Sequence, residues 1–380
     1  MNFGDIYCKI MEVKYLEIGV EIMNELKPLK MLENRVWRIY LGGKLLDQLR
    51  GADGEDGYFP EDWLASVVIA NNPERENKPE REGLSAVRLK NGEKVYLKDL
   101  IDENPEGFLG REHVDKLGVN FGVLTKFLDS AERLPIQVHP DKNAAMRLFN
   151  SQYGKTEAWC ILGGREINGE KPYILLGFKE DVTPEMLHDL FDKQDIKGME
   201  ALMHKIPVKS GEVYIIEGGT PHAIGSGCFL LEIQEPTDYT ISLEKCNTLG
   251  EKLPDFLCHQ GLGFDKMFEC FNYRKFTEKE LLDSFRLEPE AIDENTSQLI
   301  SYRRTSCFAL NRLSVKSSIT CKCLNRPYAL TVVEGFGKVG DINVKSGDCL
   351  FVPAQAEDFS IRNLSGCELV MLQCLPPYID

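Results

Sequence analysis

The chain has 380 residues, of which 60 are acidic and 45 basic, so its formal net charge is −15 at neutral pH. This length predicts two to three domains, and a content of 43% hydrophobic and 28% charged residues indicates a globular protein. The negative charge argues against nucleic-acid binding. No apolar run approaches the roughly 18 residues that cross a bilayer, and the N-terminus lacks the regions of a secretion signal. We therefore expect a cytoplasmic protein without a nucleic-acid or membrane partner.

Twelve cysteines are scattered along the chain and form no C-x-x-C pair. Several lie in apolar, strand-like runs, where a reduced thiol behaves as a small hydrophobic group. This distribution favours reduced cysteines, as in proteins of the cytoplasm.

Short strand-like runs dominate the chain after an amphipathic N-terminal segment whose pattern fits either strand or helix. Between residues 31 and 262 these runs are Ala65–Ile69, Leu134–Val138, Ala158–Leu162, Tyr173–Phe178, Val213–Ile216 and Phe229–Ile233. In the C-terminal part they are Phe308–Leu313, Ala329–Val333, Cys349–Val352 and Glu368–Leu372. Short strands separated by frequent turn residues predict a sandwich or barrel rather than a parallel α/β sheet.

Two stretches are expected to be helical. Thr183 and Pro184 have the order of an N-cap followed by proline at the first helical position. Thr277 and Glu280 have the spacing of a capping box. The predicted organisation is an N-terminal extension (1–30), a metal-binding domain (31–262) with a helical insert (183–205), a partly helical connector (263–300) and a C-terminal domain (301–380).

Four residues form a candidate metal site. Gln137 and His139 are two apart and would share one face of a strand. Glu157 follows 18 residues after His139, and a glycine turn precedes His222. Two histidines, a glutamate and a glutamine can surround a divalent ion and leave a position open for a ligand. This joint spacing is typical of the metal site of a cupin barrel.

Each of these residues, taken alone, has a plain structural explanation. A lone histidine in a β domain is commonly a hydrogen-bonded core residue, and a lone glutamate is commonly half of an ion pair. The joint spacing, rather than any single residue, therefore carries the metal prediction.

A glycine- and proline-containing cupin signature occurs twice in the chain, once before His222 and once near the C-terminus. The segment from Gly211 to His222 fits the pattern Gly-x5-Pro-x-Gly-x-x-His with Glu217 in place of proline. The segment from Gly347 to Asp358 has the same spacing, but Gln355 and Asp358 replace its final glycine and histidine. We interpret the C-terminal domain as a cupin without metal ligands.

The chain resembles the type I mannose-6-phosphate isomerase family over most of residues 31–375. The motifs that carry the resemblance are Gln137-x-His139–Pro140–Asp141, Gly154–Lys155–Thr156–Glu157–Ala158–Trp159, Pro221–His222–Ala223–Ile224–Gly225 and Glu232–Ile233–Gln234–Glu235–Pro236–Thr237–Asp238. Weaker support comes from Pro60–Glu61–Asp62–Trp63. The resemblance implies a mainly β fold of two cupin (jelly-roll) barrels with a helical insertion.

The resemblance also implies the function. It predicts a zinc-dependent isomerase that interconverts mannose 6-phosphate and fructose 6-phosphate or a related sugar, as a monomer or homodimer. One Zn²⁺ per chain would be held by Gln137, His139, Glu157 and His222. The implied catalytic residues are Lys155, Glu232 and Asp238, and the implied substrate-binding residues are Trp37, Lys126 and Ser242. We assign Glu232 as the proton shuttle, Lys155 as an electrostatic helper and Lys126 as a candidate for the phosphate.

The chain departs from the family pattern at three places, two of which concern the substrate end. Ser242 stands where the family has an arginine, four residues after Asp238, and serine cannot replace a bidentate guanidinium. Pro135 replaces a serine, and Trp37 is separated from Gly42–Gly43 by four residues.

These departures leave alternatives open. Lys245 or an arginine elsewhere could compensate, or the sugar could differ from mannose 6-phosphate. The chain could also be a catalytically impaired cupin that binds metal and sugar, or a double cupin whose polar pocket residues are only structural.

Overall fold

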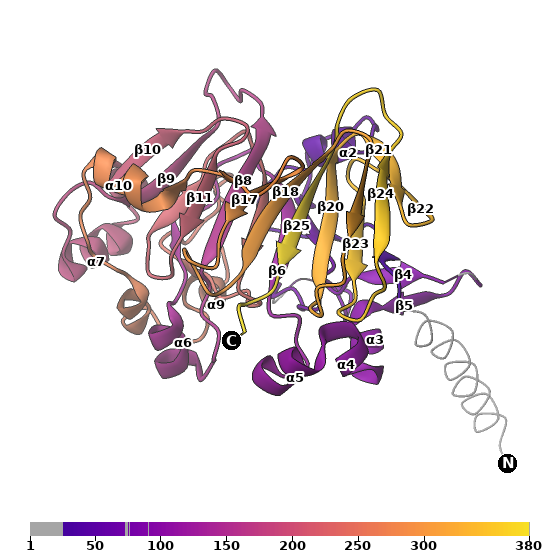
Figure 1. Cartoon of the computed structure of the whole chain (residues 1–380). Coiled ribbons are helices and arrows are strands. Elements are labelled where there is room, and N and C mark those ends of the chain that lie inside the picture. The colour runs from indigo at the N-terminus through magenta and orange to yellow at the C-terminus, as the bar shows by residue number, and fades with distance from the viewer. Residues whose placement is uncertain (1–25, 73–74, 76, 90, 380) are drawn as a thin grey trace, which may run out of the picture.

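The protein is described by a computed structural model, which covers residues 26–72, 75, 77–89 and 91–379. Most of the predicted N-terminal extension lies outside these described residues. Within them the chain is mainly β, as predicted, and the strands lie in four large antiparallel sheets (Figure 1). None of the helices in these ranges is long and apolar enough to span a membrane, and the described cysteines are free thiols.

The N-terminal part contains two of the sheets. A seven-stranded sheet has the order β15-β11-β8-β13-β6-β3-β2, and a five-stranded sheet has the order β10-β9-β12-β7-β14. The seven strands are β2 (Arg35–Val36), β3 (Glu61–Leu64), β6 (Leu124–Asp129), β8 (Glu157–Gly164), β11 (Val213–Ile216), β13 (Cys228–Gln234) and β15 (Arg286–Leu287). The five strands are β7 (Gln137–Val138), β9 (Tyr173–Phe178), β10 (Met203–Pro207), β12 (His222–Ile224) and β14 (Ile241–Ser242).

The C-terminal part contains the other two large sheets. A second seven-stranded sheet is built from β1 (Leu29–Lys30), β16 (Glu290–Ala291), β17 (Thr296–Ile300), β18 (Ala309–Val315), β20 (Tyr328–Glu334), β23 (Cys349–Val352) and β25 (Leu369–Leu375). A four-stranded sheet is built from β19 (Ser318–Cys321), β21 (Phe336–Val339), β22 (Ile342–Lys345) and β24 (Phe359–Asn363). A small hairpin joins β4 (Ala86–Arg88) and β5 (Lys94–Tyr96). In the described residues none of the sheets closes on itself.

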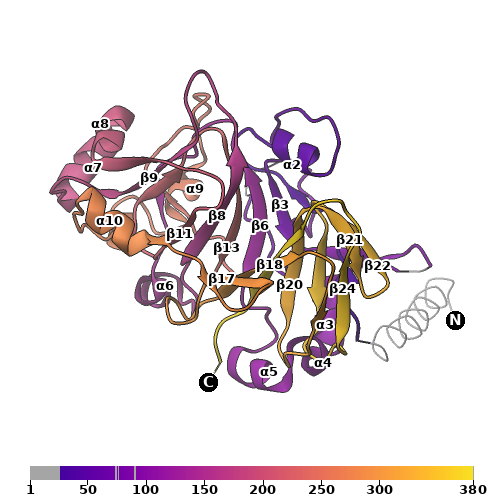
Figure 2. The ribbon, with the colours of Figure 1, turned by 45° about the horizontal axis from the view of Figure 1, so that its top comes forward.

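Helices lie at both ends of the molecule. Near the C-terminal strands are α3 (Leu97–Glu103), α4 (Pro105–Leu109) and α5 (Arg111–Leu117) (Figure 1). At the opposite end are α7 (Pro184–Lys193), α8 (Ile196–Ala201) and α10 (Glu278–Phe285) (Figure 2). The remaining helices are α2 (Lys44–Leu49), α6 (Lys142–Phe149), α9 (Asp255–His259) and the 3₁₀ helix η1 (Lys266–Cys270).

Both predicted helix starts are confirmed. The Thr183 hydroxyl accepts a hydrogen bond from the backbone N–H of Met186, which caps α7. The capping box between Thr277 and Glu280 starts α10. Strand β10 begins at Met203, inside the range that was expected to be helical.

The N-terminal seven-stranded sheet is buried on both faces, and the two faces differ. Side chains on a strand alternate between faces. On β13, Leu231 and Ile233 therefore point to the core shared with the C-terminal sheet. Leu230 lies on the opposite face, in the core between this sheet and the five-stranded sheet, and Glu232 shares that inner face by the same alternation.

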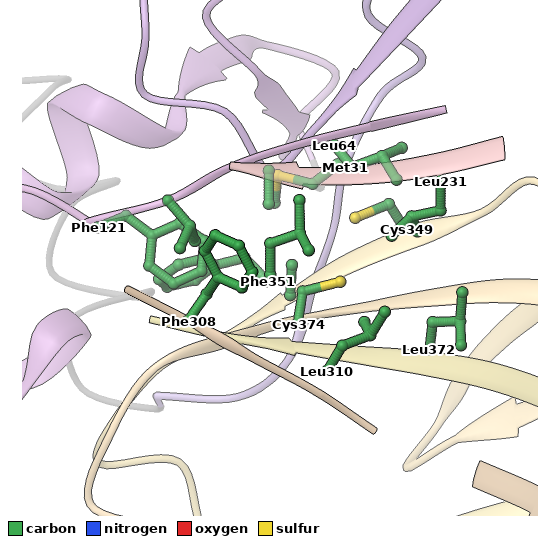
Figure 3. Packing of buried hydrophobic residues seen from close by; sticks show 14 of the residues in the cluster. Met31, Leu64, Phe121, Leu231, Phe308, Leu310, Cys349, Phe351, Leu372 and Cys374 are labelled. Atoms are coloured by element: carbon green, nitrogen blue, oxygen red, sulfur yellow. The ribbon is translucent and has the colours of Figure 1, made fainter. Parts of the chain in front are cut away.

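The core between the two seven-stranded sheets holds the N-terminal and C-terminal parts together. Figure 3 shows Leu231 and Leu64 from one side meeting Phe351, Leu372 and Cys374 from the other. This contact supports, from behind, the sheet whose inner face carries Glu232.

Two of the predicted strands are wrong in extent. The run Ala65–Ile69 is not a strand, because β3 ends at Leu64 and Ala65 has a positive φ of 48°, which breaks the extended ladder. In Leu134–Val138, only Gln137–Val138 is a strand. Pro135 has no N–H to donate, and the N–H of Ile136 donates to the Glu244 carboxylate instead of a neighbouring strand.

We predict that Phe351→Ala destabilises the whole protein. Phe351 is fully buried, and its ring packs edge-on against Phe121 with centroids 5.2 Å apart. Loss of a buried phenylalanine should lower the free energy of unfolding by about 3–5 kcal/mol in urea denaturation. Phe336→Ala, at an exposed position on β21, is the control and should change it by less than about 0.5 kcal/mol. Equal effects of the two variants would contradict this account of the core.

Candidate functional site

The predicted site residues gather between the two sheets of the N-terminal part. Glu157, Lys126 and Glu232 start from strands of the seven-stranded sheet. Gln137 and His222 start from the five-stranded sheet, where they are paired neighbours on β7 and β12. Because the two sheets face each other, residues that are far apart in the sequence meet in one buried space.

Three side chains converge as a possible metal-binding group. The candidate ligand atoms of His139, Glu157 and His222 all lie within 4.8 Å of one another. Nε2 of His139 is 3.0 Å from one Glu157 carboxylate oxygen, and Nε2 of His222 is 3.4 Å from the other. All three residues are almost completely buried.

Hydrogen bonds on the far side of each ring set the histidine tautomers. Nδ1 of His139 lies 2.8 Å from the carbonyl oxygen of Tyr239, and Nδ1 of His222 lies 2.8 Å from that of Thr220. A ring whose Nδ1–H donates to a carbonyl presents the lone pair of Nε2, as metal-bound histidines do. Both Nε2 atoms face Glu157, so the lone pairs converge on one point.

The protonation states of this group also fit a cation. Burial, with Lys155 nearby, lowers the pKa of His139 to about 3, and burial lowers the pKa of His222, so both rings are neutral at pH 7. Burial alone would raise the pKa of Glu157, but His139 and Lys155 outweigh it and hold that pKa well below its usual range. Neither carboxylate oxygen of Glu157 has a hydrogen-bond partner in the described residues. Two neutral imidazoles and an unsatisfied carboxylate are the form that binds a divalent metal ion.

Gln137 and Lys155 lie beside this group and line the adjoining cavity. The amide nitrogen of Gln137 is 3.3 Å from Nε2 of His222. Nζ of Lys155 is 3.0 Å from Nε2 of His139 and 3.4 Å from Glu157. Two residues of the cavity wall, Gln137 and Lys155, therefore contact the metal-binding group directly.

A second cluster, on the wall of the same cavity, contains Lys126 and Glu232. Nζ of Lys126 lies 3.0 Å from Glu232 and 3.5 Å from Glu61, and all three side chains are buried. Burial and the charge of Glu157 raise the pKa of Glu232 to about 7, against the opposing effect of Lys126. Glu232 is thus a buried carboxyl group that can both accept and release a proton near neutral pH.

Asp238 reaches the cavity from the loop after β13, where Arg38 holds it. Nη1 and Nη2 of Arg38 each lie 3.2 Å from one oxygen of the Asp238 carboxylate. The backbone N–H of Asn71 donates to the same carboxylate at 3.0 Å. Asp238 is therefore fixed at the cavity wall by three donors.

Sequence reasoning missed Arg38 and Glu61 as site residues. Glu61 accepts hydrogen bonds from the Tyr40 hydroxyl and the Trp63 indole, each at 2.7 Å, and from Nε of Arg38 at 3.0 Å. The available signals were the family-like segment around Glu61 and the position of Arg38 directly after Trp37. Neither signal indicates that the two residues meet.

Not every predicted substrate residue faces the cavity freely. Ser242 lines it, but its hydroxyl donates to the carbonyl oxygen of Glu244 and accepts from the N–H of the same residue. Trp37 is absent from the described residues that line the cavity, and its ring stacks on Tyr58. Lys245 does not compensate for the missing arginine, because its ammonium lies over the ring of Phe191, 4.3 Å from the centroid.

The C-terminal residues at the matching cupin positions form no such site. Asp358 is exposed and pairs with Lys322 at 2.8 Å, and it accepts the backbone N–H of Cys323. In the described part of the chain, the group found to be capable of holding a metal is the one in the N-terminal part.

The chain is similar to known mannose-6-phosphate isomerases. A family model described as phosphomannose isomerase type I, catalytic domain, matches residues 67–156. A Bacillus subtilis relative named "Putative mannose-6-phosphate isomerase YvyI" is 35% identical over 284 residues, 72% of this chain and 80% of the relative. Mannose-6-phosphate isomerase ManA of the same organism is 27% identical over 258 residues, 66% of this chain and 75% of the relative.

Solved structures share the fold. The crystal structure of the mannose 6-phosphate isomerase from Bacillus subtilis superposes with a TM-score of 0.68 at 22% identity and covers 91% of this chain and 99% of that chain. A mutant phosphomannose isomerase from Salmonella typhimurium superposes with a TM-score of 0.69 at 16% identity and covers 93% of this chain and 100% of that chain. Taken with the metal-binding group and the relative at 35% identity, these likenesses establish that the chain belongs to the type I mannose-6-phosphate isomerase family of enzymes.

Proposed function

We propose that this protein is a zinc-dependent aldose–ketose isomerase, built on two cupin units, that interconverts mannose 6-phosphate and fructose 6-phosphate. The observation that carries the proposal is the convergence of His139, Glu157 and His222 beside a cavity whose wall holds Glu232. A metal-binding group next to a buried carboxyl group of raised pKa combines the two functions that sugar isomerisation needs.

Four residues would hold the metal. His139 and His222 would bind through Nε2, Glu157 through its carboxylate, and Gln137 through its amide oxygen. Nitrogen and oxygen donors of these kinds are ligands that zinc accepts. When bound, the ion would polarise a sugar oxygen and stabilise negative charge on it.

Glu232 is proposed to move the proton. Its carboxylate removes the proton from C2 of the aldose, the C2–H electron pair forms a C1=C2 double bond, and the carbonyl electrons move to O1. The same carboxyl group returns the proton to C1, and the O2 proton passes to O1, so the ketose forms without an external oxidant. Lys126, 3.0 Å from Glu232, favours the ionised carboxylate that starts the reaction.

Charge in the cavity is compatible with a phosphorylated sugar. The cavity is lined by the cations Arg38, Lys126 and Lys155 and by the carboxylates of Glu61, Glu232 and Asp238. Lys155 also contacts Glu157 at 3.4 Å. A divalent ion bound by Glu157 would make this buried region positive although the chain has a net charge of −15. Lys126 and Lys155 are the proposed contacts for anionic oxygens of the substrate, and Asp238 is a proposed acid–base group.

A second candidate function is a protein that binds metal and sugar without turnover. The observation that favours it is Ser242, whose hydroxyl is occupied by the backbone of Glu244. Bound zinc in a purified protein that converts neither mannose 6-phosphate, other hexose phosphates nor free aldoses would support this second function.

Loss of the charged ligand should release the metal. Glu157→Gln removes the charged ligand, so we expect bound zinc, measured by atomic emission on purified protein, to fall from about one ion per chain to less than about 0.2. Glu212→Gln is the control, because Glu212 bonds to Tyr214 and lies outside the cavity. Zinc content that stays at the parent level in Glu157→Gln would contradict the assigned ligand.

Loss of the proposed base should slow the proton transfer. Glu232→Gln keeps the shape of the side chain but removes the base, so we expect kcat for mannose 6-phosphate to fall by about 10²–10⁴-fold in a coupled assay for fructose 6-phosphate. Zinc content should stay at the parent level, which separates this effect from metal loss. Turnover within threefold of the parent enzyme would exclude Glu232 as the proton shuttle.

A further inference from the structure

We propose that Arg38 is a positioning residue of this site, which acts by fixing Asp238 and Glu61 on the cavity wall. This inference rests on the proposed isomerase function and extends it to a residue outside the motifs that identify the family. Arg38 comes from the loop between β2 and the glycine turn at Gly42–Gly43, the segment that separates Trp37 from the two glycines.

The contacts of Arg38 use the whole guanidinium fork. Nη1 and Nη2 bind the two oxygens of Asp238 at 3.2 Å each, and Nε binds Glu61 at 3.0 Å. Only 12% of the Arg38 side chain is exposed. A planar fork with fixed donor directions sets the orientation of two carboxylates at once, which a lysine ammonium cannot do.

Arg38 completes a chain of alternating charges. In order of contact, the chain runs from Asp238 through Arg38, Glu61 and Lys126 to Glu232. Each carboxylate in it is buried or nearly so, and a buried carboxylate requires a partner. The charge chain thus links the loop that carries Asp238 to the strand that carries the proposed proton shuttle.

Other cations near the cavity do not provide this link. Lys126 contacts Glu61 and Glu232, and Lys155 contacts His139 and Glu157. Among the described residues that line the cavity, Arg38 is the cation that forms an ion pair with Asp238. Its removal would leave Asp238 with the N–H of Asn71, so the carboxylate would lose its fixed direction.

A double-mutant cycle between positions 38 and 238 tests the proposal on the full-length, zinc-loaded enzyme. We expect Arg38→Ala and Asp238→Ala each to lower kcat for mannose 6-phosphate by about 100-fold, with a smaller change in KM. Because Arg38 acts through Asp238, the double variant should be within about threefold of the worse single variant. Arg38→Lys, which keeps the charge but loses the fork, should recover no more than about a tenth of the parent kcat.

Controls separate positioning from damage to the fold. Arg35→Ala removes a neighbouring guanidinium that contacts Asp47 and the Phe59 carbonyl outside the cavity, and it should leave kcat within about twofold. Zinc content and the unfolding midpoint are measured for every variant. If Arg38→Ala does not fold, the cycle is run with Arg38→Lys. The kcat of that double variant should again be within about threefold of the worse single variant.

A second readout does not depend on turnover. In the Glu232→Gln background, the Kd of mannose 6-phosphate is measured by calorimetry for variants at positions 38 and 238. The two single substitutions should change Kd by factors that do not multiply in the double variant. Effects that multiply in either readout, or a kcat of Arg38→Ala within threefold of the parent, would overturn the inference. A parent enzyme that binds the sugar phosphate but never isomerises it would contradict the proposed function, while the binding cycle would still decide the role of Arg38.

Discussion

The interaction on which the site depends is the burial of Glu61 among four donors. A carboxylate that is only 3% exposed is stable only where hydrogen bonds and opposite charges replace the lost water. Tyr40, Trp63, Arg38 and Lys126 supply them, and they hold the pKa of Glu61 far below its usual range against the effect of burial. Glu61 is therefore a permanent negative charge that anchors a lysine on one side and an arginine on the other.

The fold makes this arrangement possible because one face of the sheet packs in the apolar core shared with the C-terminal sheet, while the opposite, inner face carries the charged residues. On β6, Phe127 joins the core shared with the C-terminal sheet, while Lys126 lies on the inner face. Lys126 pairs across the sheet with Trp63 on one side and Glu232 on the other, so Lys126 and Glu232 lie side by side on the cavity wall. The C-terminal part thus contributes to the site without touching it, by burying the back of this sheet.

The spacing of Gln137, His139, Glu157 and His222 could be interpreted from the sequence because each residue lies at or next to the end of a strand, where local pattern decides orientation. His139 and Glu157 do approach as that spacing suggests. The meeting of Arg38 with Asp238 could not be predicted, because 200 residues separate them and no periodicity links a loop residue to a loop residue. The strand expected at Ala65–Ile69 is absent for a related reason: its apolar composition fits a strand, but Ala65 has a positive φ and the N–H of Ser66 donates to the distant Ser85 hydroxyl.

A departure from a family pattern at one position can be understood only with the rest of the cavity in view. Taken alone, Ser242 suggests a lost guanidinium and an impaired site. In the folded chain, the cavity nevertheless contains a guanidinium, delivered by the segment after Trp37 and held by Asp238. That same segment is another of the departures, the separation of Trp37 from the glycine pair. Ser242 and Arg38 both line the cavity, so the serine at position 242 does not leave the cavity without a guanidinium. Electrostatics constrains where charges lie in space more strongly than which strand supplies them, so an active site can keep its charge pattern while the chain changes the residue that provides it.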